Sequence, residues 1–347
     1  MLIPTIVSTR APLLHAALTR VIDHKTKPLG SLGLLEPLAL RIGLVQQTIA
    51  PQLIAPAMLI FAGDHGIVEE GISAYPQSVT WQMVENFLAG GAAINVFARQ
   101  QQCAVHIVDA GVNHDFGSRP DLLSHKMGPG TRNFANTPAM DAHTCAAAMQ
   151  AGAIVVDGLE GNVVGFGEMG IGNTTAAAAI MHKITAVAVV ECVGAGTGLS
   201  VDGVRHKADV ITRAVALHAT ADTPLAILAT FGGFEMAMMV GAMLRAAERR
   251  MLLLIDGFIV SSALLVAARL EPAILDYCVF SHCSDESGHR RMLDYLNATP
   301  LLQLGLRLGE GSGCVLALPL VHSAVNFLCN MATFDSAAVS TKHDVPA

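Results

Sequence analysis

A glycine-rich stretch, residues 165–175, constrains the fold of this chain more than any other part of the sequence. Four glycines fall in its first eight residues, and the apolar residues before them predict a short buried strand at 162–164. After the glycines, residues 176–184 predict a helix with Asn173 or Thr174 as its N-cap. A strand, a glycine loop and a helix N-terminus together present backbone amides and a positive dipole end, which suits a phosphate or a carboxylate.

The same stretch matches the G-x-G-x-x-G fingerprint of dinucleotide-binding loops through Gly165, Gly167 and Gly170. Glu191 lies about 20 residues further on, where that fingerprint places an acid for a ribose hydroxyl. A chain with 32 glycines produces such spacings by chance, so a tight turn without a ligand is the competing interpretation. Glu168, inside the stretch, would repel a phosphate, and we expect it to serve another part of a substrate.

Composition indicates an α/β fold with a mostly parallel, Rossmann-like sheet flanked by helices. The 347 residues are 52% hydrophobic but only 5% aromatic, and long aliphatic tracts suit strands that are buried on both faces. A chain of this length exceeds one comfortable core, so we expect a large domain and a smaller one. The formal net charge of −7 comes without a basic stripe, which argues against a nucleic-acid partner.

Several features favour a cytoplasmic protein. The seven cysteines are scattered without a C-x-x-C pair, as is typical of reduced thiols, and the N-terminus shows no secretory signal. The apolar tracts 223–244 and 251–268 carry Glu235 and Asp256, so we expect core elements and no membrane span. The histidines lack metal-ligand spacing, and no metal site is expected.

Four predicted strands end close to an acidic residue or a histidine. They span 57–62, 105–109, 252–255 and 277–280, and the residues at or beyond their ends are Asp64, His65, Asp109, Asp256, Ser281 and His282. Ligands of open α/β sheets bind where strands deliver their carboxyl ends, so we expect these tips to share one site. For Asp64 and His65, a catalytic role and the capping of a turn stay open.

The remaining segments read as helices and connections. Helices are predicted at 12–21, 34–47 (after a possible N-cap at Ser31), 79–87, 92–99, 142–152 and 225–244, and again over the last 50 residues. Residues 187–193 fit either a strand or a turn of helix. The polar residues 113–138 predict a long excursion over the edge of the sheet.

Three glycine loops each stand near a group that can do chemistry. Glu168 lies in the first, Lys207 follows the second at 194–198, and Glu310 lies within the third at 308–313. An anion cradle with two carboxylates and a lysine suits a phosphorylated sugar whose C1 is displaced, because one carboxylate can stabilise oxocarbenium charge while the other deprotonates the nucleophile. P-loop, zincin and esterase-elbow motifs are absent.

Ten stretches, in order along the chain, carry a specific resemblance. They include KPLGSLGLLE (27–36), AGDHGIVEEGISAYPQ (62–77), GEMGIGNTT (167–175), SHCSDESGHR (281–290) and LRLGEGSG (306–313). Through them the chain resembles the nicotinate-nucleotide:dimethylbenzimidazole phosphoribosyltransferase family. The resemblance implies transfer of the 5-phosphoribosyl group from nicotinate mononucleotide to a benzimidazole nitrogen, with inversion at C1 and without a cofactor. It also implies a homodimer, a large Rossmann-like domain at 55–295 and a small helical domain formed by 1–54 and 296–347.

The resemblance further implies which residues form the site. Glu310 matches the family's proposed general base, and Glu168 is the second catalytic candidate. The positions around the ribose and phosphate are Gly170, Gly172, Asn173, Thr174, Thr175 and Lys207. The other substrate-binding positions expected are Asp64, Tyr75, Met83, Asp256, Ser281, Gly309 and Gly311.

The chemistry of the residues agrees with these roles. Nicotinate leaves from a cationic pyridinium and needs no acid, whereas the incoming azole must lose its N–H and needs a base. Burial of Glu310 in an apolar pocket is expected to raise its pKa toward neutrality. Tyr75 stands where some family members have a small hydroxyl residue, and Met83 stands where glutamine can occur, so the preference among benzimidazoles, purines and phenols stays open.

Two other functions remain as alternatives. One is a nicotinamide-dinucleotide oxidoreductase that uses Gly165, Gly167 and Gly170, with Glu191 at the ribose; this would leave the other two glycine loops unexplained. The other is a catalytically silent paralogue that only binds a nucleotide or an azole. The presence of Glu168, Lys207 and Glu310 together argues against it.

Overall fold

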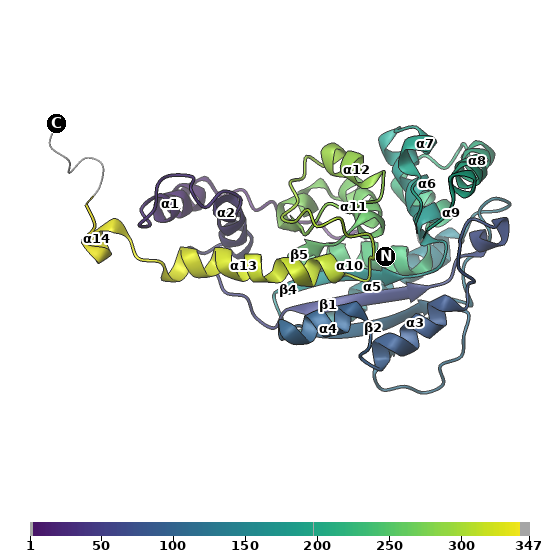
Figure 1. The fold of residues 1–347 in the computed structure, drawn as a ribbon, viewed down its shortest axis with the longest axis horizontal. Coiled ribbons are helices and arrows are strands. Elements are labelled where there is room, and N and C mark those ends of the chain that lie inside the picture. Colours follow the sequence, from purple (N-terminus) through teal and green to yellow (C-terminus); the bar gives the residue numbers. More distant parts are fainter. Residues whose placement is uncertain (1–2, 197, 341–347) are drawn as a thin grey trace.

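A computed structural model describes residues 3–196 and 198–340 of the chain (Figure 1). Thr197 of the second glycine loop lies outside the described residues, as do 1–2 and 341–347 of the predicted small domain. Within the described residues, a sheet of six parallel strands has the order β3-β2-β1-β4-β5-β6. The strands are β1 (Ala57–Gly63), β2 (Ala104–Gly111), β3 (Leu122–Ser124), β4 (Val163–Met169), β5 (Leu252–Ile255) and β6 (Cys278–Phe280).

This sheet confirms the predicted α/β fold class. Its strand order reverses between β1 and β4, which is the switch point where open α/β sheets bind ligands. Four strands lie where the apolar runs predict them. The short strand β3 was not predicted, because its three residues lie within the polar excursion at 113–138 and pair with β2 only at Ile107–Asp109.

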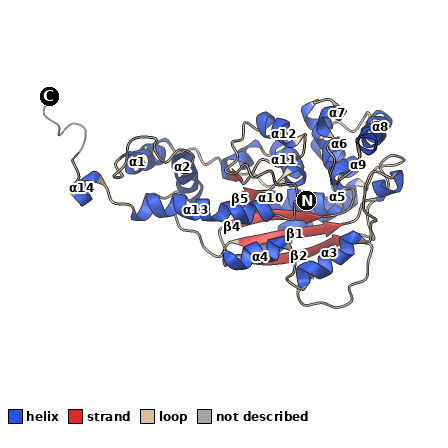
Figure 2. Cartoon of the chain, in the orientation of Figure 1, coloured by secondary structure: helices blue, strands red, loops and turns tan. Residues whose placement is uncertain are grey.

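Helices cover both faces of the sheet (Figure 2). On one face, α5 (Ala142–Asp157) packs on α10 (Phe234–Glu248), and α10 contacts β1, β2, β4 and β5. On the other face lie α3 (Val79–Leu88), α4 (Ala93–Gln100) and the first part of α13 (Ser312–Asn330), as Figure 1 shows. The remaining elements are α1 (Pro12–Asp23), α2 (Leu35–Gln46), η1 (Gly66–Glu70), α6 (Asn173–Thr185), α7 (Val189–Cys192), α8 (Val201–Leu217), α9 (Pro224–Phe231), α11 (Phe258–Leu270), η2 (Pro272–Tyr277), α12 (His289–Tyr295) and α14 (Phe334–Ala337).

The glycine stretch differs from its prediction, because β4 continues through it to Met169. Gly165 and Gly167 are therefore strand residues, and their lack of a side chain serves close packing. A Cβ at Gly165 would collide with the Met58 sulfur, and one at Gly167 would lie 2.6 Å from the Glu310 backbone carbonyl. The true turn begins at Gly170.

The start of α6 was also predicted incorrectly. The helix begins at Asn173, and Gly172, with a φ of 97°, occupies the N-cap position without a side-chain cap. Neither Asn173 nor Thr174 is the N-cap. Glu191 lies on α7 and forms an ion pair with Arg291 at 2.5 Å, and 187–193 contains this helical turn and no strand. Gly165 and Gly167 thus lie in a strand and Glu191 is paired with Arg291, so the structure does not support the dinucleotide-binding interpretation.

Helices from both end regions of the chain pack together beside the sheet (Figure 1). Here α1 packs on α2, α2 packs on α13, and an antiparallel bridge joins Lys25 to Thr333. Ser31 does not cap α2, whose N-cap position is held by Leu34. Leu301, beyond the predicted boundary at 296, still donates its amide to the Phe280 carbonyl at the end of β6 at 2.9 Å. The two-domain division stays a prediction.

One described helix, α13, is long and apolar enough to cross a membrane by length and composition. Its first part contacts β4 and α4 and it also packs on α2, so interior packing accounts for its apolar character. The tracts 223–244 and 251–268 form α9, α10, β5 and α11, whose residues are mostly buried. These are core elements, as predicted.

Candidate active site

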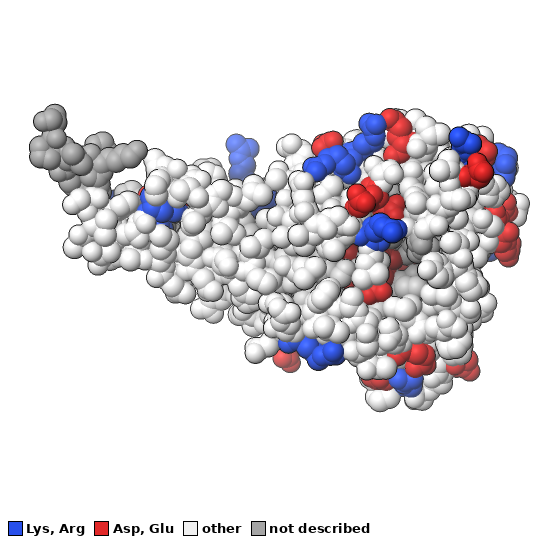
Figure 3. Space-filling view, viewed as in Figure 1, with Lys and Arg blue, Asp and Glu red and all other residues white. Residues whose placement is uncertain are grey.

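A cavity of about 630 Å³ lies beyond the carboxyl ends of the central strands. Figure 3 shows acidic and basic side chains gathered near the centre of one face, beside a hollow, while the surface over α13 is largely uncharged. The structure brings most of the predicted site residues together in the lining of this cavity: Tyr75, Met83, Glu168, Gly170, Gly172, Asn173, Thr174, Lys207, Asp256, Gly309 and Glu310.

Four residues predicted to bind substrate do not line the cavity: Asp64, Thr175, Ser281 and Gly311. Asp64 is buried behind it, where its carboxylate accepts the Asn113 amide at 2.7 Å. The Ser281 hydroxyl donates to the Cys314 sulfur at 3.3 Å. Thr175 is fully buried in the first turn of α6, and the amide of Gly311 is taken up by Asp256.

His65 is likewise buried outside the cavity, against Glu235. Its Nε2 lies 2.7 Å from Glu235 Oε1, and both side chains are almost completely buried. Burial opposes protonation of this imidazole, but the charges of Glu235 and Asp64 outweigh it and raise the pKa of His65. The Asp64–His65 pair at the end of β1 is therefore buried outside the lining of the cavity.

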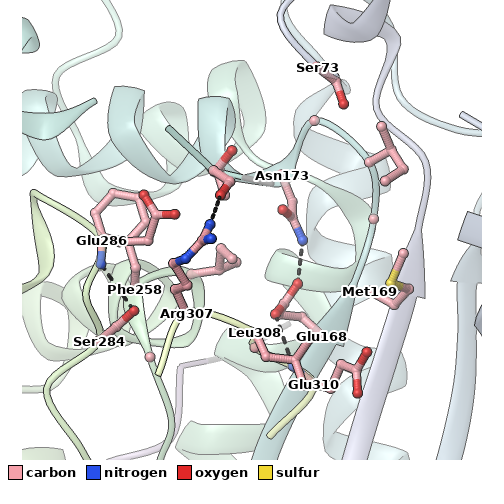
Figure 4. Close-up of a pocket in the computed structure, with 18 of the residues that line it drawn as sticks. Ser73, Glu168, Met169, Asn173, Phe258, Ser284, Glu286, Arg307, Leu308 and Glu310 are labelled. Carbon is pink, nitrogen blue, oxygen red and sulfur yellow. Dashed lines mark hydrogen bonds between the residues drawn. The ribbon is translucent and has the colours of Figure 1, made fainter. Parts of the chain in front are cut away.

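Glu168, the last residue but one of β4, lies in the floor of the cavity (Figure 4). Its carboxylate accepts a hydrogen bond from the Asn173 amide side chain and a longer one, 3.4 Å, from the backbone amide of Glu310. Burial and then the negative charge of Asp256 raise the pKa of Glu168 to about 8. A carboxyl group with this pKa favours its neutral form at pH 7.

Glu310 faces the cavity from the turn before α13. Its φ is 62°, between two glycines that also have positive φ, and its side chain is buried. Among the described residues its Oε2 has no hydrogen-bond partner. Burial and then the charge of Asp256 raise the pKa of Glu310 to about 7. A carboxyl group with a pKa near the working pH and an oxygen free to accept a proton is suited to general-base catalysis.

The opposite side of the cavity carries the cations. Lys207 on α8 is 1% exposed, and its amine donates to the Thr174 hydroxyl at 2.7 Å. Burial lowers the pKa of Lys207 to about 8, against the opposing charge of Glu286. Arg307 donates from its guanidinium to the Gly196 carbonyl at 3.4 Å (Figure 4).

The N-terminus of α6 points its amides at the same region. Three of the amides at 170–175 are already bonded: that of Ile171 donates to the Thr80 hydroxyl, and those of Asn173 and Thr175 donate to carbonyls of the turn. Among the described residues, the amides of Gly172 and Thr174 take no such bond. Together with Lys207 they are suited to binding an anion, as amides at a helix N-terminus are.

Several lining residues were not singled out from the sequence. They are Ser73, Phe258, Ser284, Glu286, Arg307 and Leu308 (Figure 4). Most of them fall within the motifs quoted above, so those motifs held the signal, but their side chains carry no feature that separates them from surface residues. Among the described residues, no three His, Cys, Asp or Glu side chains form a group that could hold a metal ion.

Comparisons with known proteins agree along nearly the whole chain. The sequence model of a phosphoribosyltransferase family matches residues 8–339. A nicotinate-nucleotide–dimethylbenzimidazole phosphoribosyltransferase from Janthinobacterium sp. (strain Marseille) is 67% identical over 342 residues, which are 98% of this chain and 99% of that protein. A protein of the same name from Dechloromonas aromatica (strain RCB) is 59% identical over 335 residues, 95% of this chain and 96% of that protein.

A solved structure shares the fold as well. The crystal structure of CobT from Thermus thermophilus superposes with a TM-score of 0.91 at 42% identity, covering 95% of this chain and 99% of that one. Sequence, fold and the assembly of Glu168, Lys207 and Glu310 around one cavity lead to the same conclusion. The chain is a phosphoribosyltransferase and belongs to the nicotinate-nucleotide–dimethylbenzimidazole phosphoribosyltransferase family.

Proposed function

We propose that this enzyme transfers the 5-phosphoribosyl group of nicotinate mononucleotide to 5,6-dimethylbenzimidazole or a related base, giving α-ribazole 5′-phosphate and nicotinate. The observation that carries the proposal is Glu310, a buried carboxyl with a pKa of about 7 and an unpartnered oxygen that faces the cavity. The names of the relatives supply the substrates. The cavity supplies the groups that this reaction requires.

The anion site orients the nucleotide. The 5′-phosphate binds at Lys207 and the free amides of Gly172 and Thr174, since this is where the cavity offers positive charge. The ribose then extends toward the two carboxyl groups at the ends of β4 and of the third glycine loop. Glu168 lies beneath C1, where developing oxocarbenium charge favours its ionised form.

The base exchange follows from charge balance. As the bond from C1 to the pyridinium nitrogen breaks, nicotinate takes the electron pair and becomes neutral at that nitrogen, so no acid is needed. The azole nitrogen attacks C1 from the opposite face, which inverts the configuration, and its N–H proton passes to Glu310. The incoming ring occupies the part of the cavity lined by Tyr75, Met83 and Leu308.

Product analysis tests the proposal. The protein is incubated with nicotinate mononucleotide and dimethylbenzimidazole, and the products are separated by chromatography and compared with authentic α-ribazole 5′-phosphate. We expect nicotinate and the α-nucleotide in equal amounts, and neither when the base is omitted. Unchanged nucleotide with a folded protein that still binds it would support the silent paralogue and refute the transferase.

We extend the proposal to a homodimer and to the cytoplasm on the strength of the family resemblance. All seven cysteines are free thiols, which suits a reducing compartment. Light scattering tests the dimer, with an expected mass twice the 36.3 kDa of one chain. A mass of one chain at micromolar concentration would contradict it.

A further inference from the structure

The turn that carries Glu310 has an unusual backbone. Gly309, Glu310 and Gly311 have φ angles of 81°, 62° and 78°, so three consecutive residues lie in the left-handed region. A glutamate adopts this conformation only under strain, and such strain persists where the surrounding structure holds it in place. The contacts of the turn show what holds it.

Asp256, just beyond β5, binds the turn with both oxygens of its carboxylate. Its Oδ2 accepts the amide of Gly311 at 3.2 Å and its Oδ1 accepts the amide of Gly313 at 2.8 Å. These two amides follow Glu310 in the chain, at the next residue and at the third residue after it. Asp256 lines the cavity but is only 1% exposed. Both of its carboxylate oxygens already accept hydrogen bonds from the turn.

The other contacts of the turn are weaker or purely local. Glu168 accepts the Glu310 amide at 3.4 Å, and the hydroxyl of Ser312 closes the turn on the Gly309 carbonyl at 2.7 Å. Asp256, in contrast, accepts two hydrogen bonds from the turn on a charged carboxylate that lies outside it. Such charge-assisted hydrogen bonds are roughly twice as strong as neutral ones.

We propose that Asp256 is a positioning residue for the transfer, which holds residues 309–313 in the left-handed turn so that the Glu310 carboxyl faces the incoming base. The inference rests on the proposed function, in which Glu310 is the base. It replaces the substrate-binding role that the sequence suggests for Asp256 with a role that acts through Glu310.

The negative charge of Asp256 changes the pKa of Glu310, which can be measured. Burial is the larger cause of the raised pKa of Glu310, and the negative charge of Asp256 is the second. The other ionisable groups on the elements around the turn are Glu168 on β4, His282 beyond β6, Cys314 on α13 and Arg307 in the preceding loop. His282 Nε2 lies 3.4 Å from Asp256 Oδ1, so a change at Asp256 also alters the surroundings of this histidine.

The variant Asp256→Asn tests the inference, because it keeps the shape of the side chain but removes its charge and turns one acceptor into a donor. We expect kcat to fall about 10²-fold, as for a reacting group displaced by about 1 Å, with little change in KM for either substrate. The pKa of the Glu310 carboxyl should fall, since the repulsive charge is lost. It is measured directly by ¹³C NMR of glutamate-labelled enzyme, with Glu310→Gln identifying the resonance.

Asp109→Asn is the matched control. Asp109 is also a buried carboxylate at a strand end, and its Oδ1 accepts the amides of Gly111 at 3.0 Å and Val112 at 2.9 Å, but it does not line the cavity. We expect wild-type kcat and an unmoved Glu310 resonance. If both variants lower kcat alike, or if Asp256→Asn leaves kcat and the Glu310 pKa unchanged, the positioning role is wrong.

A second variant covers the case in which Asp256→Asn does not fold. Asp256→Glu keeps the charge but places the carboxylate too far out to bind both amides, so the Glu310 pKa should stay high while kcat falls; wild-type kcat would overturn the inference. The titration also separates this inference from the proposed function. If Glu310→Gln shows that Glu310 is not the base, the titration of its resonance in Asp256→Asn still shows whether the charge of Asp256 acts on Glu310.

Discussion

Two buried carboxyl groups and one buried amine lie in the same cavity, and burial moves their pKa values toward one another. It raises those of Glu168 and Glu310 to about 8 and about 7, and it lowers that of Lys207 to about 8. Each group is therefore close to its titration point near neutral pH. A bound phosphate or a developing cation then decides which form prevails.

At Lys207 we predict a selective loss of nucleotide binding. Lys207→Ala removes the cation of the anion site, so KM for nicotinate mononucleotide should rise at least tenfold while KM for the azole changes little. Steady-state kinetics with each substrate varied in turn measures both. Lys183→Ala is the control, since that amine donates to the Ala219 carbonyl and does not line the cavity. An unchanged nucleotide KM in Lys207→Ala would remove this residue from the phosphate site.

At the scale of elements, β4 delivers Glu168 and also makes room for the Glu310 turn. Gly167 lies in the middle of the strand, and a Cβ there would lie 2.6 Å from the carbonyl carbon and oxygen of Glu310 and from Ile60 Cδ1. The absence of a side chain at Gly167 thus lets the turn before α13 rest on the sheet. The glycines of this strand therefore allow the Glu310 turn to pack closely on the sheet.

Gly167→Ala should accordingly lower kcat by at least tenfold, because the added methyl group pushes the Glu310 turn away from its position. Gly158→Ala is the control: Gly158 has a φ of −76° and a Cβ there makes only an ordinary contact, 3.4 Å, with the Val155 carbonyl. Kinetics of both variants at saturating substrate measures the effect. Equal activity in the two would show that the turn does not depend on close packing against β4.

A comparison of the predicted strands with the observed ones shows how much of the fold can be predicted from the sequence. Apolar runs predicted β1, β2, β5 and β6, because strands buried on both faces need such runs. The glycine stretch was misread, because glycines that permit close packing within a strand resemble those of a loop until the neighbouring backbone is known. The polar surroundings of β3 concealed it for the same reason: its pairing with β2 is a tertiary feature.

The sequence indicated which chemical groups belong to the candidate site better than it indicated where their side chains lie. Glu310 stood out because glycines on both sides of it leave no local packing reason for a carboxylate, and Glu168 and Lys207 stood out because each lies in or soon after a glycine loop. Arg307 was missed, since its place in the cavity depends on a contact with Gly196, more than a hundred residues away in the chain. Asp64 was included because it follows a strand, but its carboxylate turns to the Asn113 amide.

At the scale of the whole molecule, the buried acids make stability depend on pH. The pKa of Glu168 is raised from 4.5 to about 8 on folding. The folded state therefore favours the neutral acid, and its contribution to stability is fully present below about pH 4.5 and is lost as pH rises to about 8. Glu310 acts in the same direction over a narrower range.

Glu168→Gln should remove part of this dependence. A neutral amide needs no desolvation of charge, so the substrate-free variant should melt a few degrees above wild type at pH 8 and close to it at pH 5. Differential scanning calorimetry at the two pH values measures the difference. The same variant should show lower kcat with similar or tighter nucleotide binding, because a carboxylate near the phosphoribosyl group is lost. A variant less stable than wild type at pH 8 would contradict the raised pKa.

The role of Glu310 as the general base is tested most directly by the pH dependence of the reaction. Kinetics of wild type and Glu310→Gln are measured with dimethylbenzimidazole across about pH 5 to 9. The wild-type rate should rise through a single ionisation near the Glu310 pKa of about 7. In Glu310→Gln the rate should fall by about 10²- to 10⁴-fold and lose that rise. A variant that keeps both the rise and near-normal kcat, with a higher KM for the azole, would show instead that Glu310 only holds the base.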